Sequence, residues 1–286
     1  MKVLIFGGKG YFGGQFRTLY PEALCPEADI ADPSAVDRAL DREKPDIVIN
    51  CAGKTGRPNV DWCEDHKMET LLSNVTGPLV LLEACMKRHL YLVQMSTGCI
   101  YEGDNGGKGF SEEDPPNFFG SFYSKSKAWI DQIMQRFPVL QLRLRMPFDG
   151  VPHERNLITK LTRYSRVLDA ENSLTYLPDF LNAAKILIGK RRTGTYNVVN
   201  PGTLSPFRVM ELYREIVDPL HTFTKLTLAE LPTAVRAGRS NCILSTEKLE
   251  KEGIRMRPLE EAMQQALQGY ALKHRERGVP RLGALQ

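Results

Sequence analysis

The sequence predicts an α/β fold in which a doubly wound parallel sheet carries a smaller C-terminal substrate-binding lobe. Three observations support this prediction. Short apolar runs alternate with amphipathic helical stretches, a glycine-rich turn directly follows the first apolar run, and the pattern loosens beyond Pro147. We expect residues 1–147 and about 166–202 to form a dinucleotide-binding domain, and about 148–165 and 203–286 to form the lobe.

The expected strands are short apolar runs, as is typical of strands that are covered on both faces. They span Val3–Phe6 and residues 46–50, 91–95, 140–145 and 195–199, with a further strand near Leu24 and Cys25. Asp32 and Pro33 predict the cap and first position of a helix that leads into the next strand. Residues 259–274 predict a long amphipathic helix. The glycine-rich stretch 103–109 predicts a loop at the rim of the ligand site.

Composition narrows the class of protein. The 286 residues include 38 Lys and Arg against 34 Asp and Glu with no clustered basic run, which gives nucleic-acid binding little support. The six cysteines show neither a C-x-x-C pair nor zinc-like spacing, so we expect reduced thiols, no metal and a cytoplasmic protein. The apolar N-terminal run is too short for a signal peptide, and no run approaches the length of a membrane-spanning helix, so we expect no membrane partner.

Gly7, Gly10 and Gly13 form G-x-x-G-x-x-G between the first strand and a helix. Glycines at this spacing let the backbone turn tightly and approach a pyrophosphate, to which the helix N-terminus offers free N–H groups. The alternative is a glycine-rich turn that holds no ligand.

The glycine spacing, together with Asn50-Cys51-Ala52-Gly53 at the end of a later strand, resembles the extended short-chain dehydrogenase/reductase (SDR) pattern of the Rossmann fold. The resemblance implies an adenine contact at Asp29 and Ile30. The cofactor-binding residues expected on these grounds are Gly7, Lys9, Gly10, Tyr11, Phe12, Gly13, Asp29, Ile30, Asn50, Cys51, Ala52, Gly53, Tyr123 and Lys127.

The second strand carries no clear acidic residue at its end that could bind a ribose 2'-hydroxyl, whereas Lys9 and Arg17 could meet a 2'-phosphate. The sequence therefore favours NADPH, with NADH as the alternative. Both cations could instead belong to a solvated face.

Tyr123 and Lys127 form Y-x-x-x-K on a predicted helix, where a spacing of four places both side chains on one face. We expect the ammonium to lower the pKa of the phenol, so that Tyr123 exchanges a proton near neutral pH. Thr97 follows a strand and can hydrogen-bond a substrate carbonyl oxygen. In isolation, such a Tyr–Lys pair is common by chance.

Several longer segments resemble the plant-type bifunctional 3,5-epimerase/4-reductases of nucleotide-rhamnose synthesis, which are related to dTDP-4-dehydrorhamnose reductases. They are residues 53–64 (G-K-T-G-R-P-N-V-D-W-C-E), 97–102, 112–114, 117–118, 120–125, 143–147, 156–160 and 200–202. The resemblance implies that UDP- or dTDP-4-keto-6-deoxyglucose is inverted at sugar carbons 3 and 5 and reduced at carbon 4.

The same resemblance implies that Cys99 and Lys160 are the acid/base residues of epimerisation. It also implies sugar or diphosphate contacts for Arg57, Asn59, Asn156, Arg239 and Asn241. Cys99 could instead be a small buried hydrophobe and Lys160 a surface charge. Residues 148–155 depart from the family sequence.

Two other readings of the sequence stay open. One is a dTDP-4-dehydrorhamnose reductase without epimerase activity, against which Cys99 and the G-R-P-N-V-D-W-C run argue. The other is a non-catalytic regulatory subunit on the same scaffold, because a fold does not fix a function. A homodimer is compatible with either.

Overall fold

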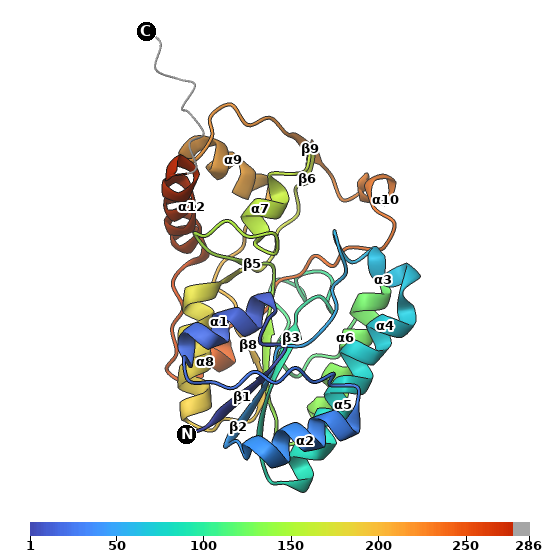
Figure 1. Cartoon of the computed structure of the whole chain (residues 1–286). Coiled ribbons are helices and arrows are strands. Elements are labelled where there is room, and N and C mark those ends of the chain that lie inside the picture. The colour runs from blue at the N-terminus through green and yellow to red at the C-terminus, as the bar shows by residue number, and fades with distance from the viewer. Residues whose placement is uncertain (277–286) are drawn as a thin grey trace.

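A five-stranded parallel sheet forms the centre of the computed structural model, which describes residues 1–276 (Figure 1). The sheet order is β1-β2-β3-β4-β8, with strands Val3–Phe6, Ile47–Asn50, Tyr91–Thr97, Leu140–Leu144 and Gly194–Asn197. Each predicted long strand is confirmed to within two residues at either end. Nearly all of their residues are buried, as expected for a sheet covered on both faces.

The strand predicted near Leu24 and Cys25 is reduced to one residue. Leu24 bridges Leu4 through backbone hydrogen bonds with Val3 and Ile5, on the edge of β1 that faces away from β2. The chain therefore reverses its strand order beside β1, which is the place where open α/β sheets bind ligands.

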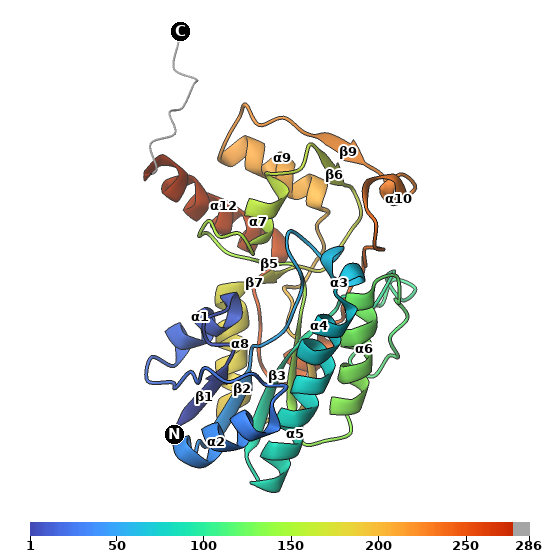
Figure 2. The ribbon, with the colours of Figure 1, turned by 45° about the vertical axis from the view of Figure 1, so that its right-hand side comes forward.

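Helices cover both faces of the sheet (Figures 1 and 2). One face carries α2 (Pro33–Glu43), the π-helix η1 (Leu72–Thr76) with α5 (Gly77–Lys87), and α6 (Phe122–Met134). The other carries α1 (Tyr11–Leu19), α8 (Leu177–Gly189) and α11 (Glu247–Lys251). The predicted start of α2 is confirmed, because the Asp32 carboxylate accepts the amides of Ser34 and Ala35.

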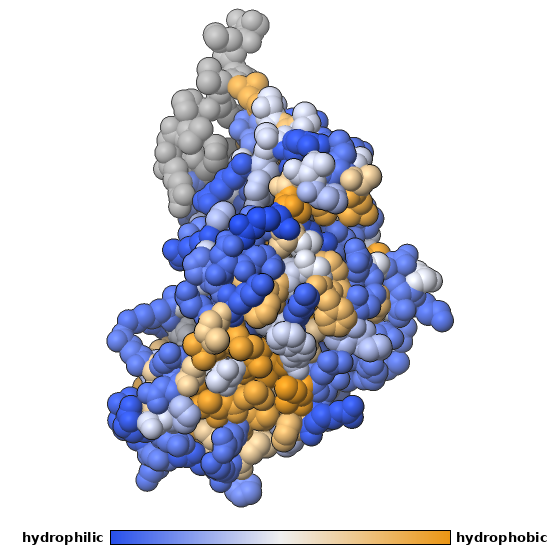
Figure 3. All heavy atoms as spheres, turned by 90° about the vertical axis from the view of Figure 1, so that its right-hand side faces the viewer, coloured by the Kyte–Doolittle hydropathy of each residue, from blue (hydrophilic) through white to orange (hydrophobic). Residues whose placement is uncertain are grey.

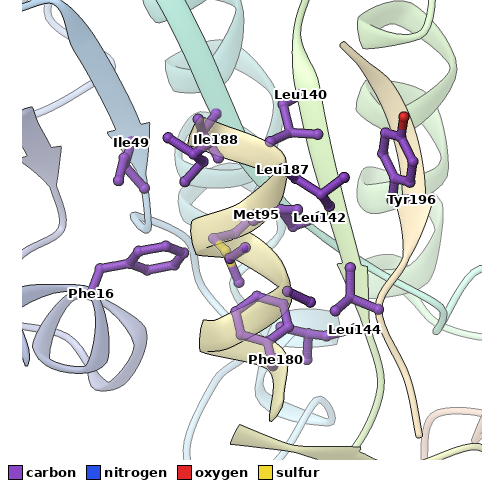
Figure 4. Packing of buried hydrophobic residues seen from close by; sticks show 14 of the residues in the cluster. Phe16, Ile49, Met95, Leu140, Leu142, Leu144, Phe180, Leu187, Ile188 and Tyr196 are labelled. Carbon is purple, nitrogen blue, oxygen red and sulfur yellow. The ribbon is translucent and has the colours of Figure 1, made fainter. Parts of the chain in front are cut away.

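The main core lies between the sheet and α1 and α8 (Figure 4). Phe180 of α8 is fully buried, and its ring meets the rings of Phe12 and Phe16 edge-on at 6.4 and 6.2 Å. This packing fixes the helix that begins directly after the glycine turn.

A second apolar cluster lies above the carboxyl edge of the sheet and forms the core of a smaller lobe (Figure 2). Its elements are β5 (Pro147–Phe148), α7 (Leu157–Leu161), β6 (Arg166–Leu168), β7 (Thr175–Tyr176), α9 (Pro206–Ile216), β9 (Thr224–Leu226) and α12 (Leu259–Glu276). Short helices α3 (Trp62–Asp65), α4 (Lys67–Leu71) and α10 (Leu231–Ala234) complete the described chain.

The division of the chain into domains stays a prediction, and packing favours different limits in two places. Val167 and Tyr176 belong to the second cluster, although residues 166–202 are expected in the dinucleotide domain. Leu249 and Ile254 belong to the main core, although residues 203–286 are expected in the lobe.

Apolar side chains gather on the side of the molecule formed by α4, η1 and α6 (Figure 3). The exposed members are Met68, Leu72, Trp129, Ile133 and Phe137, each between 37% and 66% accessible. We call these five residues the α6 patch. Within residues 1–276, no helix has both the length and the apolar character needed to cross a membrane.

Candidate active site

A cavity of about 780 Å³ lies between the sheet and the lobe, and its wall includes the segments that follow β1, β2 and β3. The carboxyl ends of parallel strands meet at this edge, which explains why residues distant in sequence converge here. Predicted site residues that line the cavity are Lys9, Gly10, Tyr11, Phe12, Cys51, Ala52, Gly53, Arg57, Asn59, Thr97, Cys99, Tyr123, Lys127, Lys160, Arg239 and Asn241. Those outside its lining are Gly7, Gly13, Asp29, Ile30, Asn50 and Asn156.

The glycine turn is shaped by two close approaches of the backbone. Gly7 has a φ of +74°, and a Cβ there would come within 2.6 Å of the Ala52 nitrogen. A Cβ on Gly13 would come within 2.2 Å of the Gly7 carbonyl oxygen. Gly10 begins α1 without a side-chain cap, which leaves the first amides of that helix open towards the cavity. The turn therefore fits an anionic group.

Asn50 and Cys51 shape the end of β2. The fully buried Asn50 amide donates to Gln94 at 2.9 Å and accepts the Ala52 amide at 3.0 Å. Burial, and next the nearby thiol of Cys25, raise the pKa of Cys51 well above its ordinary value, which keeps it a neutral thiol.

At the predicted adenine end, Ile30 is buried in the core beneath α5, while the Asp29 carboxylate accepts the Ala31 amide at 2.9 Å. Lys9 forms an ion pair with Glu27, two residues beyond Cys25. Glu27 is the acidic residue that lies near the end of this short strand, and it pairs with Lys9 of the glycine turn.

Thr97, Tyr123 and Lys127 all line the cavity, and each is less than 9% exposed. Ser121 caps α6 by accepting the Ser124 amide at 3.1 Å, which fixes the helix carrying Tyr123 and Lys127. The Thr97 hydroxyl oxygen accepts the Cys99 amide at 3.1 Å. The structure brings these three side chains together at one cavity, and their catalytic role stays a prediction.

The predicted lowering of the Tyr123 pKa is not observed. Burial raises the pKa of the phenol well above its ordinary value, although a hydrogen bond with Thr97 acts in the opposite direction. Burial lowers the pKa of Lys127 to about 8. Tyr123 is therefore protonated at neutral pH, which is the form that can donate a proton to a forming alkoxide.

Asn74 supports the site from outside the cavity lining, and no sequence pattern indicated this role. It lies on the π-helix η1, donates to the Lys54 carbonyl and accepts the Lys54 amide, both at 2.8 Å. A Cβ on Gly53 would lie 3.5 Å from the Lys127 ammonium. Asn74 thus holds the strand-end loop against the lysine.

Cys99 is half-buried beside a fully buried arginine that sequence analysis did not single out. The Arg145 Nη1 donates to Cys99 Sγ at 3.1 Å. Lys160 projects from α7 into the same cavity, and burial, followed by the charge of Arg155, lowers its pKa. The reductive and epimerising residues implied by the sequence therefore share one cavity.

The two arginines that we predict to contact the sugar or diphosphate form ion pairs with carboxylates of the protein itself. Arg57 pairs with Glu154 at 2.9 Å, and Arg239 makes two bonds to Asp61 at 2.8 and 3.0 Å. Arg239 also lowers the pKa of Asp61. Both arginines lie at the cavity, where an incoming diphosphate would compete with these carboxylates.

The three predicted asparagines differ in their placement. Asn59 accepts the Asp61 amide at 2.8 Å, and Asn241 accepts from Asn172 at 3.1 Å, both at the cavity wall. Asn156 is fully buried, caps α7 through the Ile158 amide and donates to Asp149 and Val151. This geometry does not support a sugar contact for Asn156, because its amide is already used in positioning α7.

Residues 148–155, which differ from the family sequence, contact both the lobe and the dinucleotide domain. Arg155 donates to the Thr55 hydroxyl and the Gly56 carbonyl, both at 2.8 Å. His153 stacks on Tyr11 with ring centroids 4.4 Å apart. The loop at residues 103–109, by contrast, packs on residues 241–245 and does not line the cavity, so its predicted place at the rim was wrong.

A doubly wound parallel sheet with an open glycine turn and a buried Thr-Tyr-Lys group at its carboxyl edge defines a protein of the short-chain dehydrogenase/reductase class. More narrowly, the chain belongs to the RmlD substrate binding domain family, whose model matches residues 1–167.

Named relatives agree with this assignment. A bifunctional dTDP-4-dehydrorhamnose 3,5-epimerase/dTDP-4-dehydrorhamnose reductase of Arabidopsis thaliana is 40% identical over 91% of this chain and 90% of its own. A trifunctional UDP-glucose 4,6-dehydratase/UDP-4-keto-6-deoxy-D-glucose 3,5-epimerase/UDP-4-keto-L-rhamnose-reductase of the same plant is 38% identical, with 92% of this chain covering 41% of that protein's length.

Solved structures share the fold. The L780 UDP-rhamnose synthase of Acanthamoeba polyphaga mimivirus superposes with a TM-score of 0.89 at 33% identity, over 94% of this chain and 99% of its own. A dTDP-4-dehydrorhamnose reductase of Bacillus anthracis, solved with NADP, has a TM-score of 0.79 at 23% identity over 92% and 97% of the two chains.

Proposed function

We propose that this protein is a bifunctional 3,5-epimerase/4-reductase that converts UDP- or dTDP-4-keto-6-deoxy-D-glucose into the corresponding L-rhamnose nucleotide with NADPH. The observation that carries the proposal is that Cys99 and Lys160 line the same cavity as Thr97, Tyr123 and Lys127. The relatives named as epimerase/reductase and as UDP-rhamnose synthase support it.

For the reduction, Thr97 and Tyr123 bind the oxygen of the sugar ketone, and Tyr123 delivers its phenolic proton as the alkoxide forms. NADPH, when bound, supplies the hydride. Charged Lys127, four residues further along α6, stabilises the tyrosinate that remains. The raised pKa of Tyr123 suits this direction of reaction, because the acid starts protonated.

For the epimerisation, the ketone acidifies the protons on both neighbouring carbons, and the resulting enolate oxygen is held by Thr97 and Tyr123. Inversion requires one group that removes the proton and another that adds one on the opposite face. Cys99 enters the cavity after β3 and Lys160 enters from α7, so the pair comes from two separate walls.

The glycine turn fits a dinucleotide, since a Cβ on Gly7 or Gly13 would collide with the backbone of Ala52 or of Gly7, so that glycines alone allow this tight turn before α1. We infer NADPH because Lys9, once released from Glu27, is the cation nearest to a 2'-phosphate on this turn, with Arg17 on the following helix. Measuring kcat/KM with NADPH and NADH tests this. A stronger NADPH preference in Glu27→Gln and a shift towards NADH in Lys9→Glu would locate the preference at this pair.

The decisive experiment follows the sugar by NMR in deuterated water, with UDP- and separately dTDP-4-keto-6-deoxyglucose, with and without NADPH. Deuterium at carbons 3 and 5 together with a rhamnose nucleotide is expected. Product only after addition of an external epimerase would identify a simple 4-reductase. Binding of NADPH without turnover of either sugar would favour a regulatory subunit. Cys99→Ser, Lys160→Met and Tyr123→Phe should separate the two activities within the same assay.

We also infer a homodimer that buries the α6 patch, because five large apolar side chains exposed on one face exceed what isolated surface residues explain. Light scattering after gel filtration should give twice the chain mass. Ile133→Glu should shift the protein to the monomer, whereas Leu272→Glu, at an exposed apolar residue on α12, should not. A monomeric unsubstituted protein would refute the inference.

A further inference from the structure

Asp131 is a fully buried carboxylate that lies on α6 one helical turn beyond Lys127. It pairs with the equally buried Arg143 of β4 at 2.7 Å. A buried ion pair adds little stability over a well-packed apolar pair, because both charges lose their hydration, and its best-attested use is to fix how two elements sit against each other. The elements joined here are the helix that carries Tyr123 and Lys127 and the sheet that carries Thr97.

The hydrogen bonds of Asp131 tie α6 to two strands. The Ser96 hydroxyl donates to Oδ2 at 2.6 Å, and Ser96 directly precedes Thr97 at the end of β3. From β4, Arg143 donates to Oδ1 at 2.7 Å, and Gln141 Nε2 donates to the backbone carbonyl of Asp131 at 3.2 Å. The sheet therefore holds both the side chain and the main chain of this residue.

The contact with Ser96 bears directly on the geometry of the cavity. Tyr123, Lys127 and Asp131 follow one another at intervals of four residues, so they share one face of α6. On β3, Ser96 is the immediate neighbour of Thr97. A shift of α6 along β3 would break the bond between Ser96 and Asp131, and it would also carry the phenol and the ammonium away from the Thr97 hydroxyl.

The carboxylate also acts on Lys127 through its charge. The ionisable groups around Lys127 are Tyr123 and Asp131 of α6, Cys63 of α3, and Cys99 after β3. Burial raises the pKa of Cys63, which keeps that thiol neutral. Burial lowers the pKa of Lys127 to about 8, and the charge of Asp131 opposes this lowering more strongly than either thiol does.

Arg143 is the charge that balances Asp131 on the side of the sheet. Its guanidinium lies 5.2 Å from the centre of the Tyr101 ring, and the carboxylate of Glu112 also acts on it. Burial raises the pKa of both Tyr101 and Glu112. Removal of the Asp131 charge alone would therefore leave a buried arginine without its ion-pair partner.

We propose that Asp131 is a positioning residue of the reductase, which fixes α6 against β3 through Ser96 and supplies a negative charge beside Lys127. This inference rests on the proposed function and deepens it by a residue that lies outside the cavity lining. Asp131 acts through its two neighbours and does not touch the substrate.

Two substitutions separate the hydrogen bond from the charge. Asp131→Asn keeps an oxygen that accepts from Ser96 but removes the charge, so the pH at which reductase kcat/KM falls should move from about 8 to about one unit lower. Ser96→Ala removes the hydrogen bond but keeps the charge, so kcat should fall about tenfold or more while the pH of the fall stays the same. An unmoved profile in Asp131→Asn, or full kcat in Ser96→Ala, would overturn the proposal.

The titration of Lys127 can also be followed without turnover. In protein that contains isotope-labelled lysine, the NMR signal that disappears in Lys127→Met reports this side chain. Its midpoint should lie about one pH unit lower in Asp131→Asn, and an unchanged midpoint would overturn the proposal. Absence of sugar reduction in the unsubstituted protein would refute the reductase, while this titration would still decide whether the charge of Asp131 acts on Lys127.

Two further variants keep the test decisive. Should Asp131→Asn fail to fold, combining it with Arg143→Met removes the ion pair as a unit, and the Lys127 midpoint should still move to lower pH. A midpoint that stays in place would overturn the proposal. Gln135→Ala is the matched control, because Gln135 donates to Asp131 Oδ1 at 3.0 Å from the exposed C-cap of α6. It should change neither kcat nor the pH profile, and a shift equal to that of Asp131→Asn would overturn the assignment to charge.

Discussion

Replacing Lys127 by methionine should stabilise the protein while it removes the reductase activity. The pKa of Lys127 lies near 8 in place of its ordinary 10.5, because the ammonium is buried and 8% exposed. Each pH unit of that difference corresponds to about 1.4 kcal/mol, so a charged Lys127 costs the folded state about 3 kcal/mol. Methionine has a similar apolar chain but no charge. We therefore expect Lys127→Met to raise the free energy of unfolding by about 1–3 kcal/mol, once the cost of imperfect packing is subtracted.

The dependence on pH distinguishes this explanation from a simple packing effect. Between the folded and unfolded pKa values, about 8 and 10.5, the unfolded chain binds more protons at Lys127, so the stability of the unsubstituted protein rises with pH there. The advantage of Lys127→Met in urea unfolding should therefore be full below pH 8 and shrink towards pH 10.5. A variant of equal or lower stability at neutral pH, or an advantage that persists undiminished at high pH, would refute the reasoning.

Four other outcomes follow from the site and the core. Tyr123→Phe should lower kcat for ketone reduction about 10²-fold to 10⁴-fold while NADPH binding, followed by fluorescence, is retained. Reductase kcat/KM should fall as pH rises through about 8, because Lys127 loses its charge there; a flat profile across that range would contradict the role of Lys127. Gly13→Val should abolish NADPH binding without loss of helical circular dichroism, because its Cβ would meet the Gly7 carbonyl at 2.2 Å. Phe180→Ala should destabilise the protein by about 3–5 kcal/mol in denaturant unfolding, since the ring is fully buried; a loss below 1 kcal/mol would show that the core relaxes around the cavity.

The parts of the fold that the sequence predicts are those specified by local pattern. Strand positions follow from apolar runs, the start of α2 from Asp32 and Pro33, and the glycine turn from its own spacing. Asn156 carried a local signal that was overlooked, since an asparagine directly before a helical run is typical of an N-cap.

The parts that could not be predicted depend on contacts between distant segments. Arg145 meets Cys99 across 46 residues, and Glu27 meets Lys9 only because the chain turns back at Leu24. The direction of the Tyr123 pKa shift is set by burial, which spacing along a helix does not reveal.

Helix α6 carries both the proposed catalytic pair and outward-facing apolar side chains. Tyr123 and Lys127 project from one side of this rod towards the cavity, while Trp129 and Ile133 emerge from another side. Because α6 is a rigid helix, any rotation that moves its outer side chains also moves Tyr123 and Lys127. We therefore expect a partner bound to the outer side to influence the orientation of the phenol and the ammonium, so that assembly and the proposed reduction would be coupled through this one helix.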